Sequence, residues 1–130
     1  MCVQSFVLRV KDQERRLYTR RELYVVIRRD WVKGSRLFFV GKTNTDALIG
    51  SGTFEKIVEL GEMDDKERQL CLQNNWYGKI VFELVERFLQ PLPVQDTPLA
   101  EIRPALLHGL EITREQAEEI DGLVASRIVS

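Results

Sequence analysis

The loop at residues 42–46 carries the densest group of side chains with acid–base chemistry. Lys42, Thr43 and Asp46 offer an amine, a hydroxyl and a carboxylate within this short segment. Such a set would suit a small hydrolase acting on a nucleoside or an amide. A polar loop with Asn and Asp is also an ordinary hairpin turn. These three residues are the weak catalytic candidates, and the purely structural interpretation stays open beside them.

Arginine pairs form the second group of interest, at residues 15–16, 20–21 and 28–29. Alternate residues of a strand point to one face, so Arg20 and Arg28 would share a surface if the strand between them is regular. Cations gathered in this way bind the phosphates of nucleic acids. The predicted nucleic-acid-binding residues are Arg20, Arg28, Lys33, Arg36 and Lys42. The alternative is a solvated sheet face whose cations pair with Glu22 and Asp30.

The charge distribution is uneven, although the net charge is only −1. Residues 1–45 contain eleven Lys and Arg against four Asp and Glu, while residues 46–130 contain eight against sixteen. One interpretation is a face built for an anionic partner. The other is that the two halves neutralise each other within one fold.

Aromatic residues lie near these basic positions, and single-stranded nucleic acids stack on such rings. They are Tyr18, Tyr24, Trp31, Phe39, Trp76 and Tyr77. Core packing is the competing role, and for Trp76, which follows a predicted helix, it is the favoured one.

The sequence contains no pattern typical of a metal site or of a disulfide framework. Cys2 and Cys71 are too isolated for a zinc site and too few for a disulfide framework. His108 has no second ligand at helical spacing and precedes Gly109, which is typical of a histidine at a helix C-terminus. We therefore predict no metal and no cofactor.

Length and composition predict one globular domain over residues 1–130, with 44% hydrophobic and 30% charged residues. Charges interrupt every apolar run before it reaches the length of a membrane span. The N-terminus lacks the pattern of a secretory signal, so we expect no membrane association and a cytoplasmic location.

The elements that position these residues follow from local patterns. Apolar and β-branched runs predict strands, Gly50 and Gly52 predict a bulge, and capping residues predict helices. The expected strands lie at residues 2–10, 22–29, 36–42, 47–60 and 79–89. The expected helices lie near residues 11–18, at 64–75, from 97 to about 103, and after a capping box of Thr113 with Gln116. This order predicts an α+β domain with a mostly antiparallel sheet or small barrel.

Two segments resemble the central hairpin of the PUA-like superfamily, especially its ASCH and EVE branches. The first is VKGSRLFFVG, with Lys33, Gly34, Arg36, Phe38 and Phe39. The second is ALIGSGTFEKIVEL, with Ile49, Gly50, Gly52 and Phe54. The later KIVFELVERFLQPLPV is similar to a strand of that superfamily with a proline-containing exit. Ser35 departs from the usual acidic residue, and the motif before the "E-x-R" strand is matched only loosely by residues 19–22.

This resemblance implies a PUA-like small β-barrel with short flanking helices, and the whole chain also resembles an uncharacterised, mainly archaeal family of that superfamily. Relatives such as EVE and YTH domains hold a modified base in an aromatic-lined cleft. By this resemblance Trp31, Trp76 and Tyr77 are the base-stacking candidates. Some ASCH proteins are hydrolases that use Lys, Thr and Glu, but no such set stands at matching positions here.

Three hypotheses follow. The first is a module that binds RNA or a modified nucleobase through the basic first half. The second is a protein-interaction domain or homodimer that uses apolar residues such as Phe88, Leu89 and Leu92. The third is the small hydrolase of the 42–46 loop.

Overall fold

Six strands and three α-helices form the regular structure of the described part of the chain. The structure, a computed structural model, describes residues 4–26, 29, 31–42 and 45–129, and for residues 127–129 it describes the backbone alone. The strands are β1 (Ser5–Arg9), β2 (Glu22–Val25), β3 (Arg36–Lys42), β4 (Asp46–Glu59), β5 (Gly78–Pro93) and β6 (Leu110–Ile112). The helices are α1 (Glu14–Arg20), α2 (Asp65–Gln73) and α3 (Arg114–Val129), with short 3-10 turns at Leu60–Glu62, Val94–Asp96 and Pro104–Leu106. No described helix is long and apolar enough to cross a membrane.

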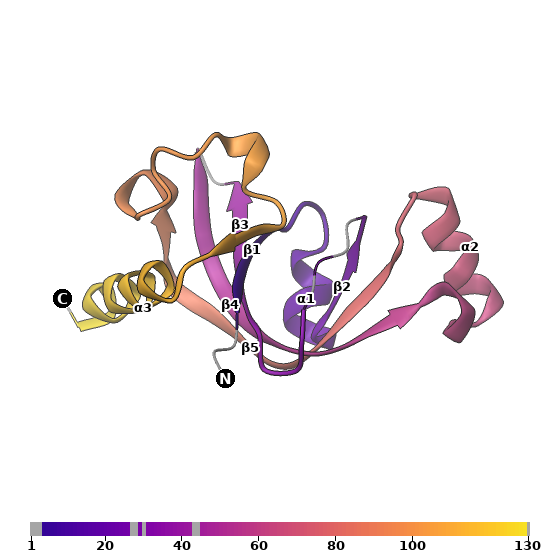
Figure 1. Ribbon diagram of the computed structural model, residues 1–130. Coiled ribbons are helices and arrows are strands. Elements are labelled where there is room, and N and C mark those ends of the chain that lie inside the picture. The colour runs from indigo at the N-terminus through magenta and orange to yellow at the C-terminus, as the bar shows by residue number, and fades with distance from the viewer. Residues whose placement is uncertain (1–3, 27–28, 30, 43–44, 130) are drawn as a thin grey trace.

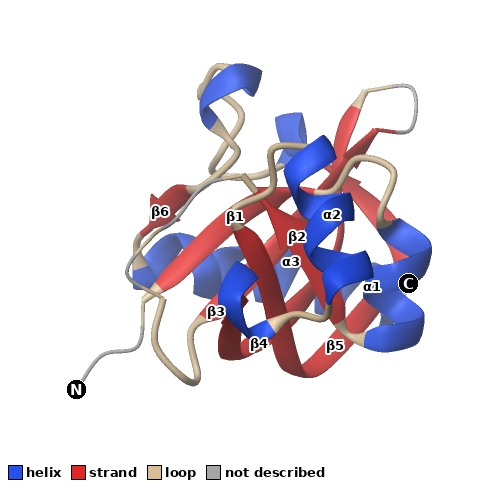
Figure 2. Cartoon of the chain, turned by 90° about the vertical axis from the view of Figure 1, so that its right-hand side faces the viewer, coloured by secondary structure: helices blue, strands red, loops and turns tan. Residues whose placement is uncertain are grey.

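All six strands belong to one sheet in the order β2-β5-β4-β3-β1-β6. Every neighbouring pair is antiparallel except β1 with β3, which run parallel. The sheet curls into an open half-barrel, and α2 and α3 lie at its opposite sides (Figure 1). Figure 2 looks onto the side that carries α2, with the curled strands behind it. The expected α+β class and the mostly antiparallel, barrel-like sheet are confirmed.

The alternation of apolar residues along the strands places two cores on opposite faces of the sheet. In β3, Leu37 and Phe39 belong to the cluster on which Leu17 of α1 packs, whereas Phe38 and Val40 belong to a second cluster. That second cluster includes Ile120 of α3. The two cores therefore use the two faces of the same strands.

The predicted irregularity at the glycines of β4 is confirmed. The pairing between β4 and β5 shifts register between Leu48 and Gly50. A Cβ atom at Gly50 would lie only 2.3 Å from both the Glu86 carbonyl oxygen and the Tyr18 hydroxyl. Gly50 is needed because strand β5 and helix α1 both approach this point closely.

The strand expected at residues 22–29 is shorter, and Arg20 does not belong to it. Helix α1 extends through Arg20 and ends because Arg21 takes a left-handed conformation, with φ of 56°, and donates its N–H to the Leu17 carbonyl. Strand β2 ends at Val25 because its partner β5 begins opposite at Gly78. The expected alternation between Arg20 and Arg28 is therefore wrong, and Arg28 itself lies outside the described residues.

Helix boundaries agree with the capping signals at two places. Asp64 precedes α2 and accepts the Glu67 N–H at 2.7 Å. Thr113 accepts the Gln116 N–H at 3.0 Å, while the Gln116 amide oxygen accepts the Thr113 N–H at 2.8 Å. The capping box before α3 is confirmed in both directions.

The helix expected from Thr97 to about residue 103 is wrong. Thr97 does cap the segment, because its hydroxyl accepts the Leu99 N–H at 3.0 Å. The following bonds, however, join Ala100 N–H to the Thr97 carbonyl and Ile102 N–H to the Leu99 carbonyl, which is the i to i+3 spacing of tight turns. With Pro104 only two residues further on, no α-helical turn is completed.

Candidate functional site

A groove of about 680 Å³ lies between α1 and α2. We call it the α1–α2 groove, and its volume is that of an ordinary small-ligand site. Its lining residues are Arg16, Arg20, Tyr24, Asp64, Lys66, Glu67, Gln69, Leu70 and Gln73. Three of these are cations and two are carboxylates, so the lining is mostly polar. Its one aromatic ring, that of Tyr24, forms the floor of the groove.

Strand β2 supplies that ring through simple alternation. Leu23 and Val25 pack into the core that also holds Leu17, so the residues between and before them face the other way. Tyr24 therefore points toward α2, and Lys79 of β5 lies directly opposite it in the strand pairing. Glu22 lies two residues before Tyr24 on the strand, so its side chain points to the same face. The sheet thus delivers a tyrosine, a lysine and a glutamate to one surface.

Tyr24 is the middle layer of a three-layer stack. The Trp76 ring lies parallel to the Tyr24 ring, with centroids 4.4 Å apart and an angle of 2° between the planes. The guanidinium carbon of Arg16 lies over the same tyrosine ring, 4.8 Å from its centroid. Since the tryptophan covers one face of the tyrosine, Arg16 covers the other. A planar cation thereby lies over the aromatic floor of the groove.

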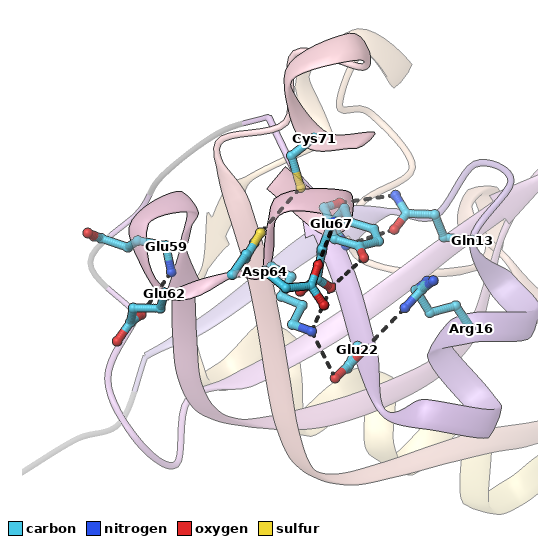
Figure 3. Close-up of polar contacts among 11 residues, drawn as sticks. Gln13, Arg16, Glu22, Glu59, Glu62, Asp64, Glu67 and Cys71 are labelled. Carbon is cyan, nitrogen blue, oxygen red and sulfur yellow. Dashed lines mark hydrogen bonds and ion pairs between the residues drawn. The ribbon is translucent and has the colours of Figure 1, made fainter. Parts of the chain in front are cut away.

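A network of charged hydrogen bonds connects this stack to α2 (Figure 3). The Lys79 ammonium bonds to Glu67 at 2.8 Å and to Glu22 at 3.2 Å, and only 13% of its side chain is exposed. Glu67 also accepts the Tyr24 hydroxyl at 2.7 Å, and Glu22 pairs with Arg16 at 3.2 Å. The charges at the base of the groove are therefore paired with one another.

The pKa values in the network favour these charged states. Hydrogen bonding from Lys79 holds the pKa of Glu67 below its usual value, against the opposing effect of burial. Burial alone would lower the pKa of Lys79, but its hydrogen bonds to Glu67 and Glu22 outweigh it and the pKa is raised. Burial and the hydrogen bond to Glu67 raise the pKa of Tyr24. At neutral pH the Lys79 ammonium and the Glu67 carboxylate are ionised, so Lys79 is a paired cation and not a nucleophilic amine.

The rim of the groove is different, because its polar groups have few partners within the described part of the chain. Arg20 ends α1, and Lys66, Gln69 and Gln73 lie on the facing side of α2, all exposed. None of these four side chains makes a hydrogen bond or ion pair to a described residue. Asp64 is the exposed carboxylate of the rim, and one of its oxygens caps α2. The rim offers two cations and two amides to a ligand.

The predicted phosphate-binding residues do not form one surface. Arg20 lies in the α1–α2 groove, whereas Arg36 pairs with Asp121 of α3 at 3.0 Å. Figure 1 shows that α2 and α3 are on opposite sides of the molecule. Lys33 precedes β3 and Lys42 ends it, so the length of a seven-residue strand, roughly 20 Å, separates them.

Part of the uneven charge is neutralised within the fold, as the second interpretation predicted. Arg9 pairs with Asp46 and Arg36 with Asp121, and each of these pairs joins the basic first segment to the acidic remainder. Arg20 and Lys66 are outside this pairing.

The catalytic candidates are only partly described, since Thr43 lies outside the described residues. The two terminal guanidinium nitrogens of Arg9 donate hydrogen bonds to the two carboxylate oxygens of Asp46, at 2.8 and 3.0 Å. This hydrogen bonding keeps the pKa of Asp46 below its usual value. Lys42 is exposed and makes no ion pair to a described residue. An aspartate bound in this way acts as a structural anchor and is poorly suited to take up a proton.

The predicted stacking aromatics occupy three different environments. Trp31 is 8% exposed and packs in the core against Phe6 and Phe54, so it offers no open face to a base. The Trp76 ring stacks on one face of the Tyr24 ring. The ring of Tyr77 packs on the core, and its hydroxyl donates to Glu59 at 3.2 Å.

The apolar residues proposed for protein contact are also divided. Leu92 is buried, and Phe88 packs against the cluster beneath α3. Leu89 alone of the three is well exposed, at 76%. Among the described residues, no group of three or more His, Cys, Asp or Glu side chains is arranged to hold a metal ion.

Sequence reasoning missed most of the groove. Arg16 was noted only as a member of an arginine pair, and Lys66, Glu67 and Lys79 were not among the candidates. These residues meet only when α2 folds back over β2. One local signal was available. Glu22 and Tyr24 alternate with Leu23 and Val25, which places a carboxylate and a phenol together on the face away from the core.

The architecture corresponds to a fold seen in solved structures. The chain is similar to the crystal structure of ASCH from Zymomonas mobilis, with a TM-score of 0.69 and 9% sequence identity over 92% of this chain and 94% of that one. It is also similar to the crystal structure of a ZmASCH mutant protein from Zymomonas mobilis, with a TM-score of 0.63 and 12% identity over 92% of this chain and 95% of that one. The protein therefore has an ASCH-type, PUA-like fold, as the sequence motifs implied.

The sequence comparisons gave no match. No model of a known protein family matches the chain, and no curated protein sequence matches it. The expected link to an archaeal family has no support in these comparisons.

Proposed function

We propose that the protein binds single-stranded RNA, with a nucleobase held in the α1–α2 groove. The observation that carries this proposal is the stack of Trp76, Tyr24 and Arg16 beside the partnerless cations Arg20 and Lys66 of the described chain. Exposed bases of RNA stack on aromatic rings and on arginine guanidinium planes. The ASCH-type fold is consistent with nucleic-acid binding but does not by itself assign a function.

Each part of a nucleotide has a matching group in the groove. The outer face of the Arg16 guanidinium is the stacking surface, because the inner face rests on Tyr24. Arg20 and Lys66 provide cations for a phosphate. The amides of Gln69 and Gln73 provide donors and acceptors for base edges. A double helix would not present its base faces to such a groove, so we expect preference for single strands.

The test is a fluorescence-anisotropy titration of labelled single-stranded RNA with the double variant Arg20→Glu/Lys66→Glu. We expect its affinity to fall at least about tenfold, equal to about 1.4 kcal/mol. The salt dependence should also become shallower, by about 0.7 in log–log slope for each phosphate that the variant no longer neutralises.

Lys56→Glu is the control for a single charge reversal outside the groove, because Lys56 is an exposed lysine of β4 that does not line it. It should bind RNA as the unchanged protein does. If the double variant binds no more weakly than this control, with equal thermal stability, the groove is not the RNA site.

A further inference from the structure

A second group of cations lies at the end of the sheet where β1 and β3 stop. These strands run parallel with Arg9 opposite Val40, so the segments that follow them leave from the same edge. Lys11 follows β1, and Lys42 is the last residue of β3. Segment 104–109 packs against the same edge, because Gly109 N–H donates to the Val7 carbonyl at 2.7 Å. Figure 1 shows this orange segment beside the ends of both strands.

Arg9 organises this edge through both its side chain and its backbone. Its guanidinium bonds both oxygens of Asp46 and, at 2.8 Å, the Pro104 carbonyl. Its backbone N–H donates to Nδ1 of His108 at 3.0 Å. Arg9 thereby neutralises the carboxylate of Asp46, on which the charge of Lys42 also acts.

His108 lies in a positive environment. Its Nδ1 accepts the Arg9 N–H, so we assign a neutral ring with the proton on Nε2. Burial lowers the pKa of His108, and the charges of Lys11, Arg9 and Arg29 lower it further. Among the described residues, the charges of Lys11, Arg9 and Arg29 that act on the ring are all positive. Contrary to the expectation of a helix C-terminus, His108 follows a short 3-10 turn and bonds to β1.

Two of the surrounding cations are available to a ligand. Lys11 and Lys42 are exposed and make no hydrogen bond or ion pair to a described residue. Arg29 is also exposed and donates its Nε–H to the Gly109 carbonyl at 3.1 Å, which holds it beside the loop. Together with the Nε2–H of His108, these groups form a surface of donors without a free carboxylate from Asp46.

We propose that this surface, the basic end (Lys11, Arg29, Lys42 and His108), contacts phosphates of the same RNA strand whose base enters the α1–α2 groove. The inference rests on the proposed function. Lys11 precedes α1 and Arg20 ends it, and a seven-residue helix is only about 10 Å long. One strand can therefore reach both surfaces by following α1. Phosphate contacts made beyond the bound base set the length and salt dependence of binding.

The test compares two ligands, a nucleoside 5′-monophosphate and a single-stranded RNA of roughly 12 nucleotides, which is within the site size of small single-strand-binding domains. For Lys11→Glu/Lys42→Glu we expect at least about tenfold weaker binding of the RNA, with a log–log salt slope shallower by about 1.4. Binding of the mononucleotide should not change, since it reaches only the groove. Lys56→Glu is again the control, and thermal unfolding checks that each variant is folded.

The outcomes separate the two proposals. If Lys11→Glu/Lys42→Glu binds the RNA as the control does, the basic end is not a phosphate surface, whatever the groove does. Equal losses for the mononucleotide and the RNA would also overturn the inference, because they would place both lysines at the groove. Should Arg20→Glu/Lys66→Glu bind both ligands normally while the lysine variant loses the RNA, the groove proposal fails and the basic end remains as a phosphate surface. If the folded protein binds neither ligand at low salt, both proposals are wrong.

Discussion

Helices α2 and α3 are attached to the sheet in two different ways. Helix α3 rests on a cluster of buried apolar residues that draws on strands β1, β3, β4 and β5 and on the turns before β6, with Ala117 and Ile120 as its own contribution. Helix α2 rests on a cluster of only three buried residues, Tyr24, Met63 and Cys71. The partly buried Val58, Leu60 and Trp76 pack against this cluster, and Arg68 of α2 donates hydrogen bonds to the Leu60 and Met63 carbonyls. The polar network of Lys79 with Glu22 and Glu67 supports α2 further.

This difference explains where a ligand site can exist. An apolar cluster such as the one beneath α3 excludes water, and the pockets beside Asp121 on that side are smaller, at about 330 and 480 Å³. A helix held by charged hydrogen bonds leaves polar groups and open space at its edge, and the α1–α2 groove is that space. Helices with few buried apolar contacts also open locally more easily. We therefore expect α2 to be the adaptable side and α3 the stable side.

The largest expected effect comes from the α3 side. Ile120→Ala removes a fully buried side chain from the α3 cluster and should lower the free energy of unfolding by about 3 kcal/mol. Because this cluster is shared with the strands, the loss should appear in global unfolding. Chemical denaturation measures it, and a decrease below about 1 kcal/mol would show that α3 contributes little to the core.

A smaller and local effect is expected on the α2 side. Lys79→Met retains much of the side-chain bulk but leaves Glu22 and Glu67 without their shared cation, at a cost of about 2 kcal/mol. Hydrogen exchange should become faster throughout α2 while α3 keeps its protection. The matched change Lys56→Met, on an exposed lysine, should leave both helices as they are. Equal loss of protection in α2 and α3 would contradict the separation of the two sides.

The smallest effect is a dependence of α2 on pH. The pKa of Glu67 is lowered in the folded state, so its contribution is fully present above its unfolded value, about 4.3, and is lost as the pH falls through the folded value. Hydrogen exchange in α2, corrected for intrinsic rates, should therefore show less protection in acidic solution below this value than at neutral pH. Glu67→Gln should remove most of this dependence. If the variant keeps the full pH response, another carboxylate is responsible.

Local sequence signals predicted the framework of this fold better than its site. Strand β3 was predicted close to its observed bounds, and the capping box of Thr113 and Gln116 was found, because both depend on neighbouring residues. The segment at 97–103 failed because a cap at Thr97 favours a helix but cannot show that only tight turns follow.

Local sequence signals could not predict the groove, because its residues come together only in the folded chain. Glu22, Glu67 and Lys79 are far apart in the sequence and meet only through the pairing of β2 with β5 and the return of α2. Charge counting found the basic first half, yet it could not separate Arg36, which is paired on the α3 side, from Arg20, which has no ion pair to a described residue. Tertiary contacts decide which cations remain available.

The most direct test of the RNA site is to locate its binding on the molecule. Backbone amide signals of the ¹⁵N-labelled protein, followed by NMR during titration with single-stranded RNA, report every affected residue. We expect the largest changes at Arg16, Arg20, Lys66 and Gln69 of the α1–α2 groove, and little change around Asp121 of α3. Changes concentrated on the α3 side, with the groove unaffected, would contradict the proposed function.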